Sequence, residues 1–201
     1  MIKPPQQPII IITAPSGAGK TSITRYLMQQ YPQLAFSVSA ATRQPRPNEK
    51  DGVDYHFITE EAFRNFIEAD AFIEWEMVYP GKYYGTLKNE LERIWAAGQV
   101  PVLDIDVKGA MQVQQRFAGQ TLSLFIEPPS LEILEHRLRK RGTETPEGLQ
   151  VRLHKAAYEL SFRSKFDHVI VNDQLTEACR QAAVALARFL GTPSVGKAAE
   201  K

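Results

Sequence analysis

A short glycine-rich turn near the N-terminus joins two segments of different character. Before it stands Ile9–Thr13, a run of β-branched residues that is apolar on both faces, as in a central strand covered by helices on both sides. After it, residues 21–30 have helical character and stop near Pro32. A buried strand, a tight turn and a helix in this order predict an α/β fold.

The same alternation continues along the chain. Further strands of the buried type are predicted at residues 100–105, 122–126 and 168–171. Helical patterns separate or follow them at residues 110–116, 130–141, 146–162 and 176–190. Strands that alternate with helices predict a parallel sheet wound by right-handed crossovers and flanked by helices.

Residues 39–91 break this rhythm. They are rich in aromatic residues, arginines and turn residues. We interpret them as an insert with its own small sheet and a short helix around residues 60–68.

Composition sets the class of protein. The chain has 201 residues, 43% of them apolar and 23% charged, with a net charge of +1, so no global field attracts nucleic acid or an anionic membrane. No segment approaches the ~20 apolar residues of a membrane span, and the run at residues 9–12 is too short for a signal peptide. Cys179 has no partner for a disulfide. We therefore expect a cytoplasmic protein that binds neither nucleic acid nor membrane.

The turn itself matches a phosphate-binding motif. Residues 14–21 follow the pattern G-x-x-x-x-G-K-[ST], except that Ala14 opens it, and a strand and a helix flank it as the motif requires. We call this segment the phosphate loop, and it consists of Ala14, Pro15, Ser16, Gly17, Ala18, Gly19, Lys20 and Thr21.

Each residue type in the loop has a chemical reason. Glycines let backbone N–H groups curl around a phosphate at the positive end of the following helix. Lys20 would reach the β- and γ-phosphates, and the hydroxyl of Thr21 would bind Mg²⁺. The alternative is a chance glycine turn between a strand and a helix, which rarely has Lys-Thr after the second glycine. The loop alone leaves GTPases, transport ATPases and small-molecule kinases open.

The insert carries basic and acidic candidates. Arg43 and Arg46 lie three apart on a proline-stiffened turn, with Tyr55 following, which makes an anion clamp or a solvated basic turn. Glu74 lies in an aromatic segment, where a carboxylate is costly to bury unless something donates hydrogen bonds to it.

These motifs resemble those of bacterial-type guanylate kinases, a family of nucleoside monophosphate kinases. The likeness rests on Val38-Ser39, Thr42-Arg43-Gln44-Pro45-Arg46, Gly52-Val53-Asp54-Tyr55, Phe72-Ile73-Glu74-Trp75, Tyr83-Tyr84-Gly85-Thr86, Leu103-Asp104-Ile105-Asp106-Val107-Lys108-Gly109 and Val171-Asn172-Asp173. It runs from about Ile9 to Leu190, with the motifs in family order. The resemblance implies the reaction ATP + GMP → ADP + GDP with Mg²⁺.

The resemblance also implies a GMP site. Residues matching Arg43, Arg46, Tyr55 and Tyr84 hold the phosphate of GMP in the family, and Glu49 belongs to the same site. Those matching Glu74 and Asp106 accept hydrogen bonds from N1–H and the 2-amino group of guanine, and those matching Ser39 and Thr86 reach O6. Adenine lacks these donors, so such a site discriminates between the bases by ~10⁴–10⁵.

Residues for ATP and Mg²⁺ can be assigned as well. Asp104, which ends an apolar strand, is expected to organise Mg²⁺ with Thr21, although a strand-end cap would have the same form. Arg141 and Arg152 match lid arginines that close over the triphosphate, and Asn172 matches a residue near the adenine of ATP. The expected catalytic set is Lys20, Arg46, Arg141 and Arg152.

The pattern of the sequence, its composition and the resemblance together predict a division of the chain. A core phosphate-loop domain would comprise residues 1–38, 92–138 and 165–190, a GMP-binding domain residues 39–91, a lid residues 139–164 and a mobile tail residues 191–201. Binding of both nucleotides would close the insert and the lid.

Two rival functions follow from the same residues. A guanylate-kinase-like scaffold domain would bind proteins and lack the phosphate loop, whereas Lys20, Thr21 and Asp104 are all present here. A related kinase could act on another phosphorylated small molecule, such as a ribose bisphosphate, but Glu74 and Asp106 favour guanine. Ala41 and Lys108 depart from common family residues, and the chain could be a monomer or a homo-oligomer.

Overall fold

The computed structural model describes residues 7–47, 49–141 and 146–193. Its centre is a five-stranded sheet in the order β2-β7-β1-β8-β9, and every neighbouring pair in it is parallel. The strands are β1 (Ile9–Thr13), β2 (Leu34–Phe36), β7 (Val100–Asp104), β8 (Thr121–Glu127) and β9 (His168–Val171). The predicted parallel sheet flanked by helices is confirmed, with one strand more than the sequence indicated.

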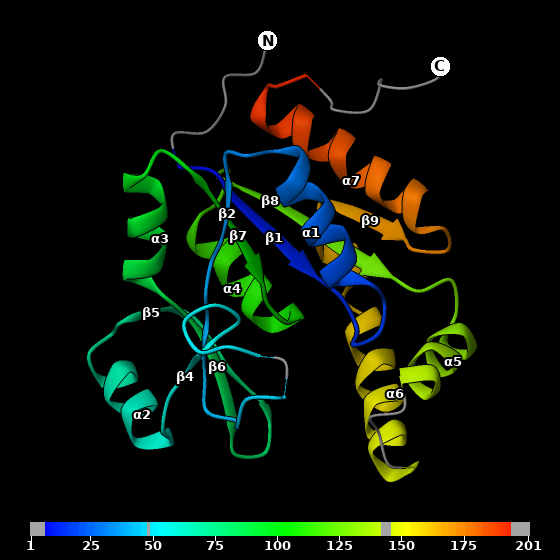
Figure 1. The fold of residues 1–201 in the computed structure, drawn as a ribbon, viewed down its shortest axis with the longest axis horizontal. Helices are drawn as coiled ribbons and strands as arrows, with labels where there is room; N and C mark the ends of the chain where they lie inside the picture. The colour runs from blue at the N-terminus through cyan, green and yellow to red at the C-terminus, as the bar shows by residue number, and fades with distance from the viewer. Residues whose placement is uncertain (1–6, 48, 142–145, 194–201) are drawn as a thin grey trace.

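Helices cover both faces of this sheet (Figure 1). They are α1 (Lys20–Gln30), α3 (Lys88–Ala96), α4 (Val107–Arg116) and α7 (Leu175–Leu190). Alternate residues of β1 serve the two sides: Ile10 and Ile12 pack towards α1 and α7, while Ile9 and Ile11 pack towards α3 and α4. All four isoleucines are fully buried, which is why the run carries no polar face.

The insert builds a second sheet with the order β4-β3-β6-β5. Its strands are β3 (Ala40–Ala41), β4 (His56–Phe57), β5 (Phe72–Tyr79) and β6 (Lys82–Leu87), and α2 (Glu60–Glu68) packs on it. The side chain of Thr59 caps α2 by accepting a hydrogen bond from the N–H of Ala62 at 3.1 Å. The predicted short helix at residues 60–68 is confirmed at these bounds.

Two further helices, α5 (Leu131–Arg141) and α6 (Pro146–Leu160), pack on each other, and the 3₁₀ turn η1 (Arg163–Lys165) follows. Leu134, Leu138, Leu149 and Ala156 form their shared apolar contact. The insert and the α5–α6 pair lie at one end of the central sheet, on opposite sides of it (Figure 1). Among the described residues, no helix has the length and apolar character needed to cross a membrane.

Several predicted bounds differ from the structure. β2 and α3 were not predicted, because β2 has only three residues and α3 begins directly where β6 ends, so the expected boundary at residue 91 falls inside α3. The strand at residues 100–105 ends at Asp104, and the helix at residues 110–116 begins earlier, at Val107, because Asp106 caps it. Residues 194–201 of the expected tail lie outside the described residues.

Candidate active site

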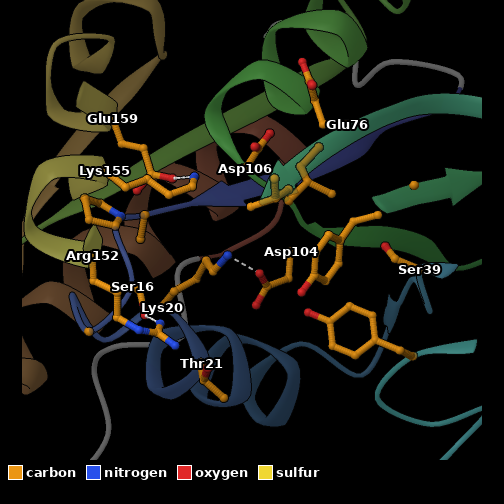
Figure 2. Close-up of a pocket in the computed structure, with 18 of the residues that line it drawn as sticks. Ser16, Lys20, Thr21, Ser39, Glu76, Asp104, Asp106, Arg152, Lys155 and Glu159 are labelled. Atoms are coloured by element: carbon orange, nitrogen blue, oxygen red, sulfur yellow. Dashed lines mark hydrogen bonds and ion pairs between the residues drawn. The ribbon is translucent and has the colours of Figure 1, made fainter. Parts of the chain in front are cut away.

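A cavity of about 260 Å³ opens where β1 and β7 end, between the phosphate loop, the insert and α6. Figure 2 shows Lys20 and Asp104 near its centre, with Arg152, Lys155 and Glu159 of α6 to the left. From the loop, Ala14, Pro15, Ser16, Gly17, Gly19, Lys20 and Thr21 line it. Of the other predicted site residues, Ser39, Arg46, Tyr55, Glu74, Tyr84, Asp104, Asp106 and Arg152 line it.

Two glycines shape the phosphate loop. Gly17 and Gly19 have φ angles of 96° and 101°, in the left-handed region that L side chains rarely adopt. A Cβ at residue 19 would also lie 2.1 Å from Nδ2 of Asn172, which donates a hydrogen bond to the carbonyl of Ala18 at 2.7 Å. Asn172 is buried and braces the loop from behind, outside the cavity lining. Its expected contact with adenine stays a prediction.

Lys20 and Asp104 meet across the cavity in an ion pair (Figure 2). Burial alone would lower the pKa of Lys20, but the neighbouring Asp104 carboxylate outweighs burial and raises the pKa above its ordinary value. Thr21 lies at the first turn of α1, exposed to the same cavity. The site thus places a cation and two oxygen ligands beside a loop of backbone N–H groups.

Hard oxygen ligands of this kind suit Mg²⁺, which keeps several waters and takes one or two protein ligands together with phosphate oxygens. Thr21 and Asp104 supply one hydroxyl and one carboxylate on neighbouring elements. No group of three or more His, Cys, Asp or Glu side chains placed to hold a metal occurs in the described part of the chain. One hydroxyl and one carboxylate suit a metal that phosphate oxygens also hold.

On the insert side, Glu74 is the most buried carboxylate of the cavity, with 4% of the residue exposed. Its Oε1 accepts a hydrogen bond from the hydroxyl of Thr86 at 2.6 Å, and a Cβ at Gly109 would lie 2.4 Å from Oε2. Burial raises the pKa of Glu74 to about 7, Thr86 opposes the rise, and the charge of Asp106 adds to it. Thr86 lies behind Glu74, outside the cavity lining.

Asp106 stands at the start of α4, opposite Glu74. Its Oδ1 accepts a hydrogen bond from the N–H of Gly109 at 2.9 Å and so caps the helix. Two carboxylates from separate elements therefore converge on one part of the cavity. They suit a ligand that presents adjacent hydrogen-bond donors.

The arginine turn is organised around Arg43. Its guanidinium donates to both carboxylate oxygens of Glu49, at 2.5 and 2.7 Å, and its Nε donates to the hydroxyl of Tyr84 at 3.1 Å. It also lies 5.0 Å from the ring centre of Tyr55. The hydrogen bonds to Glu49 raise the pKa of Arg43 and lower that of Glu49. Arg46, whose side chain is 63% exposed, reaches the cavity itself.

Most of the residues predicted for the site line this cavity, but some do not. Arg43, Glu49, Thr86, Ala18 and Asn172 lie in a layer behind the lining. The side chain of Arg141, at the end of α5, lies outside the described residues, so its expected role stays a prediction.

Three acidic or basic lining residues were missed: Glu76, Lys155 and Glu159. The last two share one face of α6 with Arg152, because the three residues are spaced three and four apart. That spacing within the predicted helix at residues 146–162 was the signal that could have found them.

The fold and the site together define a class of protein. A parallel sheet ends in a phosphate loop that faces a second pocket of arginine, tyrosine and paired carboxylates, as in a phosphate-loop kinase with a separate acceptor site. The model of the guanylate kinase family matches residues 6–188 of the chain. The chain belongs to the guanylate kinase family, whose members phosphorylate GMP to GDP with ATP, and it is a kinase.

Individual proteins similar to this chain are guanylate kinases as well. The chain is 48% identical over 183 residues to a guanylate kinase of Bacteroides fragilis, covering 91% of this chain and 90% of the relative. It is 46% identical over 188 residues to a guanylate kinase of Salinibacter ruber, covering 94% and 100%. The crystal structure of guanylate kinase from Anaplasma phagocytophilum is similar with a TM-score of 0.74 and 30% identity, covering 94% of this chain and 90% of that one.

Proposed function

We propose that this protein transfers the terminal phosphoryl group of ATP to GMP and releases ADP and GDP. The observation that carries the proposal is one cavity with two different halves. Lys20 and the phosphate loop form one half, and the paired carboxylates Glu74 and Asp106 form the other. Membership of the guanylate kinase family supports both halves.

In the donor half, backbone N–H groups of the loop bind the β-phosphate of ATP, and Lys20 reaches the β- and γ-phosphates. Asp104 holds the Lys20 ammonium in the cavity before substrate arrives. Thr21 and Asp104 would hold Mg²⁺, which neutralises phosphate charge when bound. Asn172 keeps the loop in shape through Ala18.

In the acceptor half, Glu74 and Asp106 accept hydrogen bonds from N1–H and the 2-amino group of guanine. The hydroxyl of Thr86 donates to Glu74, and a hydroxyl has one proton to donate. We therefore assign Thr86 to positioning Glu74, and Ser39, which lines the cavity, to donating to O6 of guanine. Adenine would leave both carboxylates without partners.

The phosphate of GMP lies against Arg46, Tyr55 and Tyr84, which face the cavity. Arg43 and Glu49, bonded to each other, position that set: Arg43 holds the hydroxyl of Tyr84, and Glu49 accepts from the backbone N–H of Arg46 at 2.8 Å. This assignment modifies the expectation that Arg43 and Glu49 contact GMP themselves.

Transfer needs no general base, because the phosphate of GMP is already an anionic nucleophile. Catalysis rests on positioning and on cations around the phosphoryl group, namely Lys20, Arg46, Arg152 and Arg141. Arg152 donates to the hydroxyl of Ser16 at 2.8 Å, so α6 already touches the phosphate loop before nucleotides bind. Closure of the insert towards α6 would then exclude water. The cytoplasmic setting and the oligomeric state stay predictions from the sequence.

A coupled assay of ADP release tests the proposal. ATP and Mg²⁺ are supplied with GMP, AMP, UMP or no acceptor. Of these four reactions, we expect rapid release of ADP only in the one that contains GMP. A scaffold domain would release no ADP with any acceptor, and release with AMP or UMP at the rate seen with GMP would contradict the assignment of Glu74 and Asp106.

A further inference from the structure

An ion pair on α6 faces the cavity instead of the solvent. Lys155 and Glu159 lie one helical turn apart and are joined by a salt bridge, and both line the cavity (Figure 2). Only 5% of Glu159 is exposed, and only 22% of the Lys155 side chain. No role assigned above to the loop, the carboxylates or the arginines uses this pair.

A purely structural role explains the pair poorly. On α2, Arg64 and Glu60 form an ordinary pair of the same spacing, with 65% and 45% of their side chains exposed. Such helix pairs contribute only ~0.3–0.5 kcal/mol. Withdrawing a carboxylate and an ammonium from water costs more than a helix pair of this spacing returns, so stability alone is a weak reason for placing the pair in a cleft. Charged groups drawn into a cleft are typical of functional sites.

The position of the pair indicates the partner. Arg152, one turn before Lys155 on α6, contacts Ser16 of the phosphate loop. At the other end, Glu159 interacts electrostatically with both Lys20 and Asp106, one from each half of the cavity. Lys155 itself lines the cavity that the phosphate loop shares with Glu74 and Asp106.

We propose that Lys155 is a further cation for the phosphoryl group in transfer, and that Glu159 is its positioning residue. In the empty protein Glu159 directs the ammonium into the cavity. When ATP and GMP bind, Lys155 contacts phosphate oxygens from the α6 side, opposite Lys20. This inference rests on the proposed function, because it needs a phosphoryl group between two nucleotides.

Steady-state kinetics of Lys155→Gln, with both substrates varied, test the inference. We expect kcat to fall by about 10- to 100-fold, because the charge matters most when the phosphoryl group is in transit, while KM for GMP changes little. Lys155→Arg keeps the cation and should recover much of the loss. Arg64→Gln, which breaks the exposed pair on α2, is the matched control and should behave as the wild type.

Glu159 is tested through its partner. If Glu159 acts by positioning Lys155, Glu159→Gln lowers kcat in the wild type but has little further effect in the Lys155→Gln background. Thermal unfolding of each variant separates this coupling from loss of fold. Unchanged kcat in Lys155→Gln, or additive effects of the two substitutions, would overturn the inference. An inactive wild type would instead overturn the proposed function.

Discussion

The two halves of the cavity are built in different ways. The donor half comes mainly from the eight consecutive residues of the phosphate loop, with Asp104 added from the end of β7, and many of its working groups are backbone N–H groups shaped by Gly17 and Gly19. The acceptor half is assembled from side chains on separate elements, such as Glu74 on β5, Tyr84 on β6 and Asp106 before α4. The donor half depends on backbone conformation, and the acceptor half depends on buried charges held by partners. Substitutions in the two halves should therefore have different effects on binding, turnover and stability.

The largest expected effect separates the halves. In Lys20→Met, we expect turnover to fall by ~10³ or more, because the lysine that stabilises the transferred phosphate is gone. Binding of GMP, measured by calorimetry without ATP, should persist, since Glu74 and Asp106 remain in place. Loss of GMP binding together with turnover would show that the halves are one unit and would break the comparison.

A second effect belongs to the acceptor half alone, and it concerns stability. Burial raises the pKa of Glu74 to about 7, above its ordinary value of 4.5, so the folded protein holds this proton more tightly than the unfolded chain. The resulting penalty is absent below about pH 4.5, grows as the pH rises, and is complete above about pH 7. It amounts to on the order of 3 kcal/mol.

Denaturant unfolding of the wild type and Glu74→Gln between pH 4 and pH 9 measures this penalty. We expect the stability of the variant relative to the wild type to increase across that window, because glutamine carries no charge to bury. The comparison of the two proteins cancels other titrating groups, including Glu159, whose pKa burial also raises. A pH-independent difference would contradict the buried carboxylate.

The same substitution should weaken catalysis while it strengthens the fold. We expect Glu74→Gln to lower kcat/KM for GMP by about 10- to 100-fold, the usual contribution of a charged hydrogen bond. In the wild type, kcat/KM should also rise with pH through about 7, because the ionised Glu74 accepts from guanine. The phosphate of GMP titrates nearby, at a pKa of about 6, but it does so in both proteins. A rise that survives in Glu74→Gln therefore belongs to GMP and not to Glu74.

The difference between the halves also explains what the sequence could predict. The phosphate loop and the strand Ile9–Thr13 were predicted from residue types alone, since neighbours in sequence are neighbours in the site. In the acceptor half, Glu74 and Asp106 were paired only through the family resemblance, because no local pattern links β5 to the start of α4.

The sequence could not predict whether a site residue lines the cavity or lies behind the lining. Arg43 and Arg46 look equivalent on their turn, yet Arg43 is bonded to Glu49 and Tyr84 while Arg46 reaches the cavity. Which arginine turns inward depends on contacts with β6 that no spacing of residues encodes. Lys155 and Glu159 were missed for a different reason. Their spacing from Arg152 places them on its helix face, but a charged helix face usually meets solvent and here it meets the cavity.

The smallest expected effect concerns the support of the donor half. Asn172→Ala removes the hydrogen bond to the carbonyl of Ala18 and leaves a buried acceptor without this partner, which costs about 1–3 kcal/mol of stability. Because the loop must hold its N–H groups in place to bind phosphate, KM for ATP should rise severalfold, while KM for GMP stays unchanged. Asn172→Asp keeps the size, loses the donor and adds a buried negative charge beside the Ala18 carbonyl, so it should lower stability and raise KM for ATP more than the alanine variant does. Equal changes in both KM values would mean that the loop and the acceptor half are mechanically coupled.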